Sequence, residues 1–549
     1  MVVEVCRRAS SRFVSLACVI VVCAGLLSAC SSKDETPPHG SAVTSSSGGR
    51  AAGSGCAAEA DPGSGSAGLP VTARWAVVCS GGNHTESVAA ADLNGDGTAD
   101  LVVQGSASRR ASQGTMPHVL AIDGATGEKL WQSKDVVAMI TLARFGDMNG
   151  DGIPDVLVNG RGAAIDERPL VALDGRTGRR LWRIEATDPS WRNIYTPQPA
   201  GDVNADGIGD WVISTGGDTI RAPLDAPTVR GEVAVVSGAD GVVLGRVGLP
   251  EVQEIYASPV LLTDEDGSLS IVVGSGGEVF PGSLWRIRLD AVLRGDAAGF
   301  QRLLPGDDKS SYIAPVSVAD LDHDGHVEVV AVRSDGLVTV VEPVSGAERW
   351  STKVDASPPG TPEMLTFSIA VPAIGEMDGD PALEIAVGSY AISRDNLIAG
   401  DMRRAPGSVT VLDGSTGSIE QRLQVRDGFS VSSPLLVTSS SGLAAVLCTC
   451  ATSPATSGDE AASTGLGLWV PGRSDVEPIG VISEPNTTPA VVGVGGSFVV
   501  VTIGEAPQTD DGDATQISAV PVQLDGAPVA SAPWAGYMGT AGTGHRDGN

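Results

Sequence analysis

The 549-residue sequence predicts an all-β fold, a β-propeller with eight four-stranded blades, or seven if one late unit is irregular. Three observations predict this fold. A nine-residue loop rich in Asp, Asn and Gly recurs, and each copy runs into a Val-rich strand. A turn of the form Asp-Gly-x-Thr-Gly recurs between later strands. Together they divide residues 71–540 into units of roughly 40–60 residues, a period typical of propeller blades.

Composition and charge narrow the class of partner. The chain contains 71 Gly and 34 Pro residues, which favour turns over long helices, and only 4% of it is aromatic. Its formal net charge of −30 would repel a phosphate backbone, so we expect no nucleic-acid partner. Much of the negative charge lies in the recurring acidic loops, where bound cations would offset the repulsion between carboxylates.

The first 29 residues have the layout of an export signal. A basic start at residues 7–12 precedes an apolar run at 13–29, and Cys30 follows the small residues Ser28 and Ala29. This pattern resembles a bacterial lipoprotein signal peptide with its lipobox, which implies cleavage before Cys30 and attachment of lipid to its thiol. The alternative is a plain transmembrane anchor, because the apolar run is nearly long enough to span a bilayer.

Both alternatives place the remaining chain outside the cytoplasm, anchored to the bacterial cell membrane. Ser31, rather than Asp, follows the cysteine, which in a two-membrane envelope resembles the pattern sent to the outer membrane or cell surface. Residues 30–70 are rich in Ser, Gly, Ala and Pro, a composition typical of a flexible linker. We also expect residues 541–549 to form a disordered tail.

The first unit contains every part of the repeat. A strand at 87–91 enters the acidic loop at 92–100, and the apolar run 101–103 leaves it. A third strand at 119–122 ends in the turn at 123–127, and Leu130-Trp131 closes the unit. We expect the tryptophan to pack between blades; the alternative is a stacking platform for a sugar or cofactor.

Later units keep this plan with decreasing regularity. Acidic loops recur at 147–155, 202–210, 320–328 and 376–384. The fourth unit has Leu262 and Ser270 where the first and last loop ligands should stand, so we expect weak metal binding or none there. Units seven and eight begin like the others but have short neutral turns in place of the loop.

The sequence also suggests how the ring closes. Residues 73–80 contain Trp75 at about the distance before the first acidic loop that Trp131 has before the second. They therefore look like a fourth strand whose first three strands come from the C-terminal unit, near residues 516–524, which would remove an exposed edge. Residues 533–537 compete for the same position.

Four cysteines follow the lipidated one: Cys56, Cys79, Cys448 and Cys450. In an oxidising compartment they allow two disulfides in three pairings. Cys448 and Cys450 lie two residues apart on an expected strand, so their side chains point the same way and a direct bridge would be strained.

The acidic loop suits a hard divalent cation. Side-chain oxygens stand at positions 1, 3, 5 and 9, Gly stands at position 6 in the first loop, and the carbonyl of position 7 can join the shell. This spacing matches Ca²⁺, which takes six to eight oxygen ligands. The alternative is a solvated, Asx-rich turn that binds no metal.

These loops look like the FG-GAP or VCBS repeats of integrin-α-type propellers, and the Asp-Gly-x-Thr-Gly-x-x-Leu-Trp turns are similar to those of quinoprotein-like (PQQ-type) propellers. The resemblance implies a calcium-binding propeller displayed on a cell envelope. Carried over residue by residue, it implies calcium ligands at Asp92, Asn94, Asp96, Thr98 and Asp100; Asp147, Asn149, Asp151, Ile153 and Asp155; Asp202, Asn204, Asp206, Ile208 and Asp210; Asp320, Asp322, Asp324, His326 and Glu328; and Glu376, Asp378, Asp380, Ala382 and Glu384. The fourth residue of each set acts through its carbonyl, and Glu376 departs from the pattern at position 1.

Catalytic motifs are missing from residues 71–540: the sequence there has no G-x-S-x-G, H-E-x-x-H or Walker pattern. PQQ dehydrogenases, as a family, use adjacent cysteines, and Cys448-Thr449-Cys450 departs from that. We therefore expect a binding, adhesion or scaffolding module with a protein or glycan ligand. The alternative is an extracytoplasmic polysaccharide lyase on a calcium-binding propeller, which would need a Lys, Arg or Tyr base in the central channel.

Overall fold

The structure is a computed structural model that describes most of the chain from residue 74 onward, and one short strand before it. The described residues are 56–58, 74–80, 85–105, 119–133, 142–159, 170–184, 191, 193–217, 229–277, 280–361, 364–399, 405–425, 432–452, 464–481, 488–494, 496–505 and 514–546. The expected signal peptide and Cys30 lie outside them. Among the described residues, no helix has the length and apolarity needed to cross a membrane.

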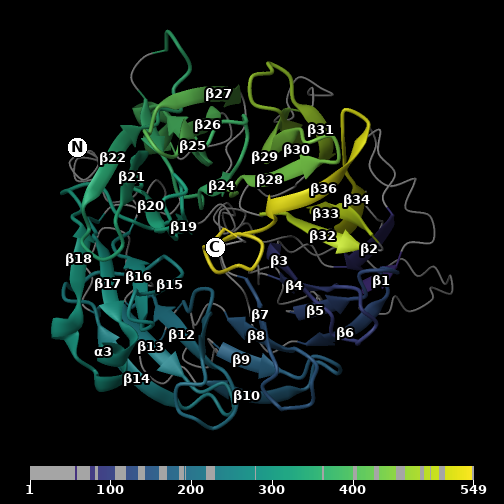
Figure 1. Cartoon of the computed structure of the whole chain (residues 1–549). Coiled ribbons are helices and arrows are strands. Elements are labelled where there is room, and N and C mark those ends of the chain that lie inside the picture. The colour runs from purple at the N-terminus through teal and green to yellow at the C-terminus, as the bar shows by residue number, and fades with distance from the viewer. Residues whose placement is uncertain are drawn as a thin grey trace, which may run out of the picture.

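The chain forms eight antiparallel sheets arranged in a ring, so the prediction of an all-β propeller with eight blades is confirmed (Figure 1). Blade one contains β3 (Thr85–Ala91), β4 (Asp100–Gly105), β5 (Val119–Ile122) and β6 (Lys129–Ser133). Blade two contains β7 (Arg144–Gly146), β8 (Asp155–Asn159), β9 (Leu170–Leu173) and β10 (Arg180–Ile184). Blade three contains β11 (Gln198–Gly201), β12 (Asp210–Thr215), β13 (Glu232–Val236) and β14 (Val243–Gly248). Blade four contains β15 (Val260–Thr263), β16 (Leu269–Gly274), β17 (Leu284–Arg288) and β18 (Gln301–Leu304), with α3 (Leu289–Arg294) and the 3-10 turn η4 (Ala297–Gly299) between its last two strands.

The remaining blades follow the same meander with additions. Blade five contains β19 (Ser317–Ala319), β20 (Glu328–Val332), β21 (Leu337–Val341) and β22 (Glu348–Lys353). Blade six contains β23 (Leu365–Phe367) and β24 (Ala373–Gly375), which both pair with β25 (Glu384–Ile392), then α4 (Arg394–Ala399), β26 (Gly407–Asp413) and β27 (Ile419–Val425). Blade seven contains β28 (Leu435–Ser439), β29 (Ala444–Thr452), β30 (Thr464–Trp469) and β31 (Glu477–Val481). Blade eight contains β32 (Ala490–Val494), β33 (Ser497–Glu505) and β34 (Ala514–Pro521).

The middle strands of a blade are buried on both faces because each sheet packs between two neighbours. Every residue of β8, β9 and β20 is buried, and apart from Asp155, Asn159 and Glu328 at the strand ends these residues are apolar. The outermost strands are more exposed: in β22 no residue is buried. The core is therefore shared between blades, and no blade buries its own apolar faces alone.

The ends of the chain close the ring as the sequence predicted. Strand β2 (Trp75–Ser80) pairs with β34, with Trp75 opposite Ala519, and supplies the fourth strand of blade eight. Strand β1 (Cys56–Ala58) then pairs with β2, so residues 56–58 of the expected linker are part of the sheet, which corrects that expectation. Residues 533–537 do not compete for this position. Strand β36 (Ala527–Trp534) follows β35 (Gln523–Leu524) and pairs instead with β28 of blade seven.

The C-terminal segment runs into the centre of the ring (Figure 1). His545 forms a parallel bridge with Val318 of β19, whose N–H donates to the carbonyl of Gly544 at 2.7 Å. The His545 ring is 2.6 Å from the carbonyl oxygen of Leu261. The expectation of a disordered tail at 541–549 is therefore wrong for residues 541–546. The tail makes these contacts with the first strands of blades that are far away in the sequence. The amino-acid composition of the tail does not predict such contacts.

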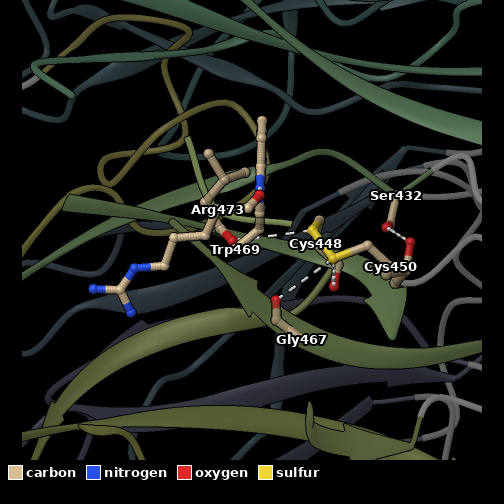
Figure 2. Close-up of a disulfide and its surroundings, with 8 residues drawn as sticks. Ser432, Cys448, Cys450, Gly467, Trp469 and Arg473 are labelled. Carbon is tan, nitrogen blue, oxygen red and sulfur yellow. Dashed lines mark hydrogen bonds between the residues drawn. A yellow bond between two sulfur atoms is a disulfide. The ribbon is translucent and has the colours of Figure 1, made fainter. Parts of the chain in front are cut away.

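Cys448 and Cys450 form a direct disulfide on β29 (Figure 2). The pairing of β29 with β30 shifts register between Cys448 and Ala451, which indicates an irregularity at this point. Their Cα atoms are 5.2 Å apart, within the range that a disulfide spans. A bridge between residues two apart would be strained on a regular strand, and the bulge in β29 brings the two cysteines into a geometry that allows it. The backbone register places Cys56 opposite Cys79.

Candidate metal sites

Each predicted acidic loop connects the first and second strands of its blade, and its first residue organises the turn. In blade one, Asp92 accepts hydrogen bonds from the N–H groups of Gly95 (2.6 Å), Asp96 (3.1 Å) and Gly97 (2.9 Å). Gly97 has a φ of 84°, a conformation that favours glycine. The bonds from positions 5 and 6 of the loop recur at Asp147, Asp202 and Asp320. The loops therefore close over their first carboxylate as the motif predicts.

The loop of blade six differs in its backbone. Pro381 stands at position 6, where the other loops have Gly with positive φ, so this loop keeps only the positive φ at position 4, which is 94° at Gly379. Glu376 accepts from the N–H of Asp378 at 3.2 Å and of Gly379 at 2.5 Å. Its longer side chain thus takes part of the role that Asp92 has in blade one.

The last residue of the loop is buried and joins it to the turn between strands three and four. In blade one, Asp100 accepts from the N–H groups of Leu93 (2.9 Å), Asn94 (3.2 Å) and Gly124 (3.2 Å). Burial raises the pKa of Asp100, and it raises the pKa of Asp155 in the same place in blade two. In the first three blades this predicted ligand therefore also acts as a structural acceptor of amide hydrogen bonds.

Close packing at this junction explains the first glycine of the Asp-Gly-x-Thr-Gly turn. A Cβ on Gly124 would lie 1.9 Å from the carbonyl oxygen of Ala99 in the acidic loop, and one on Gly175 would lie 1.9 Å from that of Pro154. No side chain fits at such a distance. The turn and the acidic loop of a blade are therefore one packed unit.

The recurring tryptophans connect each unit to the next blade. Trp131 donates its indole N–H to the carbonyl of Gly175 at 2.7 Å, and Trp182 donates to that of Gly238 at 2.7 Å. Trp75 of β2 donates its indole N–H to the carbonyl of Gly124 at 2.9 Å. The strand that closes the ring therefore makes the same contact as the other tryptophans. The prediction that these tryptophans pack between blades is confirmed.

Blades five and six bring carboxylates together most closely. Carboxylate oxygens of Asp320, Asp322 and Glu328 lie within 4.8 Å of one another, as do those of Glu376, Asp378 and Glu384. The two glutamates are fully buried at position 9 and longer than the Asp of other blades. In each of them, Oε1 has no hydrogen-bond partner among the described residues.

The turns of these two blades explain why those oxygens are left without amide donors. In blade five, Pro343 follows Glu342 where other turns have Asp-Gly, and proline has no N–H. In blade six, the N–H of Gly414 donates to the carbonyl of Leu383 at 2.9 Å instead of to Glu384. A buried carboxylate oxygen aimed among other carboxylates fits a hard cation, so the residues of blade six fit Ca²⁺.

Two strand-four side chains that the loop motif did not include reach these clusters. Arg349 of β22 places Nη1 2.7 Å from Oδ2 of Asp322 and Nη2 3.0 Å from Oε1 of Glu328. In blade six, Glu420 of β27 forms a second group of carboxylates with Asp378 and Asp380, within 4.8 Å. Arg349 and Glu420 occupy the same position of the repeat, where blade one has Leu130. This shared position is the feature of the sequence from which both could have been found.

Blade six contains two glutamates whose pKa values are raised. Burial, with repulsion from Glu376 and Asp378, raises the pKa of Glu384 to about 8. Burial, with repulsion from Asp378 and other carboxylates, raises the pKa of Glu420 to about 7. In blade four, by contrast, Asp264 is already paired with the guanidinium of Arg286 at 2.7 Å.

Arg144, one of the residue types that a lyase could use as a base, contacts the C-terminal segment. Its Nη1 donates to the carbonyl of Ala541 in the C-terminal segment, and burial lowers its pKa to about 10. Gln198 donates to the carbonyl of Gly542 at 3.2 Å. These polar groups therefore hold the tail.

Comparisons with known proteins agree with this architecture. The FG-GAP repeat model matches residues 84–114, and the model described as outer membrane protein assembly factor BamB matches residues 115–249. No curated protein sequence matches the chain.

Solved structures with a similar fold are distant in sequence. A quinohemoprotein alcohol dehydrogenase from Pseudomonas putida has 12% identity and a TM-score of 0.46, over 78% of this chain and 74% of its own. One from Comamonas testosteroni has 12% identity and a TM-score of 0.45, over 77% and 72%. BamB from Moraxella catarrhalis has 11% identity and a TM-score of 0.39, over 80% and 98%. The chain is thus an eight-bladed β-propeller with an FG-GAP repeat at residues 84–114 and BamB-like repeats over residues 115–249.

Proposed function

We propose that this chain is a calcium-stabilised binding or scaffolding propeller, held at the bacterial cell envelope by lipid on Cys30. The observation that carries the calcium part is the buried Oε1 of Glu384, which has no hydrogen-bond partner within the described chain and lies in a group with Glu376 and Asp378. Calcium bound to the acidic loops would neutralise their carboxylates and hold the first two strands of a blade together.

The scaffolding part rests on the shape of the molecule. The eight sheets of the described chain form a ring in which neighbouring blades share buried residues, and repeat folds of this kind present extended surfaces that suit protein or glycan ligands. The family model matched at residues 115–249 describes an outer membrane assembly factor, which supports a place in the envelope. The export signal and Cys30 point to the same compartment.

The contacts of the C-terminal segment bear on the alternative, a polysaccharide lyase. Arg144 and Gln198 bond to the tail, so a sugar chain would have to displace residues 541–546 to reach them. A lyase would release unsaturated product from acidic polysaccharides in the presence of Ca²⁺, and a rise in ultraviolet absorbance would support that activity. We expect no rise.

Two measurements test the proposal. Excess EDTA should lower the Tm of the purified chain by several degrees, and Ca²⁺ should restore it, because ligand binding to the native state alone stabilises that state. An unchanged Tm would contradict the proposed calcium binding. In cells, the wild-type chain should fractionate with membranes and a Cys30→Ser variant should not be lipidated. Equal metabolic labelling of both chains by a fatty acid would contradict the proposed lipid attachment at Cys30.

A further inference from the structure

In blades five and six, one position on the fourth strand places its side chain beside the acidic loop. It lies three residues after the last glycine of the Asp-Gly-x-Thr-Gly turn and directly before the tryptophan position. Blades one and two have the apolar Leu130 and Leu181 there. Blade five has Arg349 and blade six has Glu420 at this position. The repeat therefore places a neutral, a positive or a negative side chain beside otherwise similar loops.

In blade five this side chain acts as a tethered cation. The Arg349 guanidinium is 2.7 Å from Asp322, 3.1 Å from Asp324 and 3.0 Å from Glu328. It therefore contacts three of the four side chains that the loop motif assigns to a metal. Its nitrogens lie within ion-pair distance of the oxygens that a metal ion would need, including Oε1 of Glu328, toward which the geometry is not that of a hydrogen bond.

In blade six the same position adds a carboxylate to the cluster. Glu420 groups with Asp378 and Asp380, and Asp378 also groups with Glu376 and Glu384. The two groups share Asp378, so five carboxylates surround one loop. This is more negative charge than the nine-residue motif alone supplies.

No arginine or lysine of the described chain pairs with these five carboxylates within the 4.0 Å of an ion pair. Arg546 of the C-terminal segment interacts electrostatically with Glu376 and Glu384, at longer range. The Oε1 atom of Glu384 is fully buried and has no hydrogen-bond donor in the described residues. The unpartnered oxygen of Glu384 thus points to a cation within its group with Glu376 and Asp378, and Asp378 links this group to Glu420.

We propose that the side chain before the tryptophan position decides which cation holds each loop: Glu420 is an additional metal ligand that completes a divalent-cation site on blade six, and Arg349 replaces the metal on blade five. This inference rests on the proposed calcium binding and refines it. The extra carboxylate makes blade six the tightest site, because ligand charge count strengthens Ca²⁺ binding. Blade five binds no metal while its arginine is present.

The test is calorimetric titration of the mature chain with Ca²⁺ after chelator treatment. Glu420→Leu, which introduces the residue of blades one and two, should weaken the tightest site about tenfold. Glu420→Arg should remove one site from the stoichiometry. Arg349→Leu should add one site. The matched control is Glu128→Gln, an exposed carboxylate in the blade-one turn, which should change neither affinity nor stoichiometry.

The outcomes separate this inference from the proposed function. If the wild-type chain binds no Ca²⁺, the calcium proposal itself fails. If it binds Ca²⁺ but Glu420→Arg and Arg349→Leu leave the stoichiometry unchanged, only the assignment of residues 420 and 349 is overturned. Circular dichroism of each variant without metal checks folding. Should Arg349→Leu fail to fold, Arg349→Gln keeps hydrogen-bonding capacity without the charge and should gain the same site.

Discussion

Arg286 lies inside blade four with its guanidinium 2.7 Å from Oδ1 of Asp264, and both side chains are about nine-tenths buried. Ser270, at the last loop position, donates to the same carboxylate at 2.6 Å. This loop lacks the predicted metal ligands at both ends, and the arginine supplies the positive charge that a metal would supply elsewhere. The loop is thus held by an ion pair with additional hydrogen bonds.

Removing Asp264 should therefore be costly. Asp264→Ala leaves the buried guanidinium without its partner, and breaking such a pair costs about 3–5 kcal/mol of unfolding free energy. Urea denaturation followed by circular dichroism measures this loss. The control is Asp266→Ala, because Asp266 pairs with Arg288 on the surface, where ion pairs contribute little. Similar losses in both variants would contradict the assigned role of Asp264.

The first glycine of the turn provides a steric prediction. Gly175→Ala would place a Cβ 1.9 Å from the carbonyl oxygen of Pro154, so the acidic loop and the turn of blade two must separate. We expect a loss of about 2–3 kcal/mol in unfolding free energy, the upper range for overpacking. Gly209→Ala is the matched control because nothing lies within 4 Å of its added Cβ. If Gly175→Ala left the unfolding free energy unchanged, the acidic loop and the turn would be able to move apart at little cost.

Features that recur along the chain could be predicted from the sequence. The repeat predicted the blades, and Trp75 predicted the closure, because both depend on patterns that recur along the chain. The acidic loop of blade one closes around Asp92 as expected, because Asx side chains accept hydrogen bonds from nearby amides. The calcium itself stays a prediction.

Other features depend on contacts that no local pattern encodes. Arg349, which lies beside Glu328, and Glu420, which groups with Asp378, were missed because they come from strand four, outside the loop motif. The bridge between Cys448 and Cys450 depends on a bulge in β29, and the sequence there reads as a regular strand. Residues 541–546 resemble a disordered tail in composition, yet they bond to strands hundreds of residues away.

The raised pKa of Glu384 predicts how pH affects the metal-free protein. Its pKa of about 8 in the folded chain lies above the ordinary value of 4.5, because it is buried and near other carboxylates. The folded state then binds the proton more tightly than the unfolded state, so this contribution to stability is complete below about pH 4.5. It is lost as pH rises through about 8.

Thermal unfolding in EDTA should show this dependence as a Tm that falls between pH 5 and pH 8. Glu384→Gln should flatten that slope and raise the Tm at pH 8 relative to the wild-type chain, because a neutral amide avoids the charge. With Ca²⁺ present, the variant should instead be the less stable protein. Parallel pH profiles for wild type and variant in EDTA would rule out Glu384 as the group responsible.

The C-terminal segment should stabilise the whole ring, because it links first strands of blades that are far apart in sequence. Residues 541–546 contact Arg144 of blade two, Gln198 of blade three, Leu261 of blade four and Val318 of blade five. Deleting residues 541–549 leaves Arg144 and the N–H of Val318 without these acceptors, and each unmet buried group costs about 1–3 kcal/mol. We expect a clearly lower Tm and faster hydrogen exchange in β19. Deleting only residues 547–549 is the matched control and should leave both unchanged. If the longer deletion melted like the full chain, the tail would occupy the ring centre without holding it together.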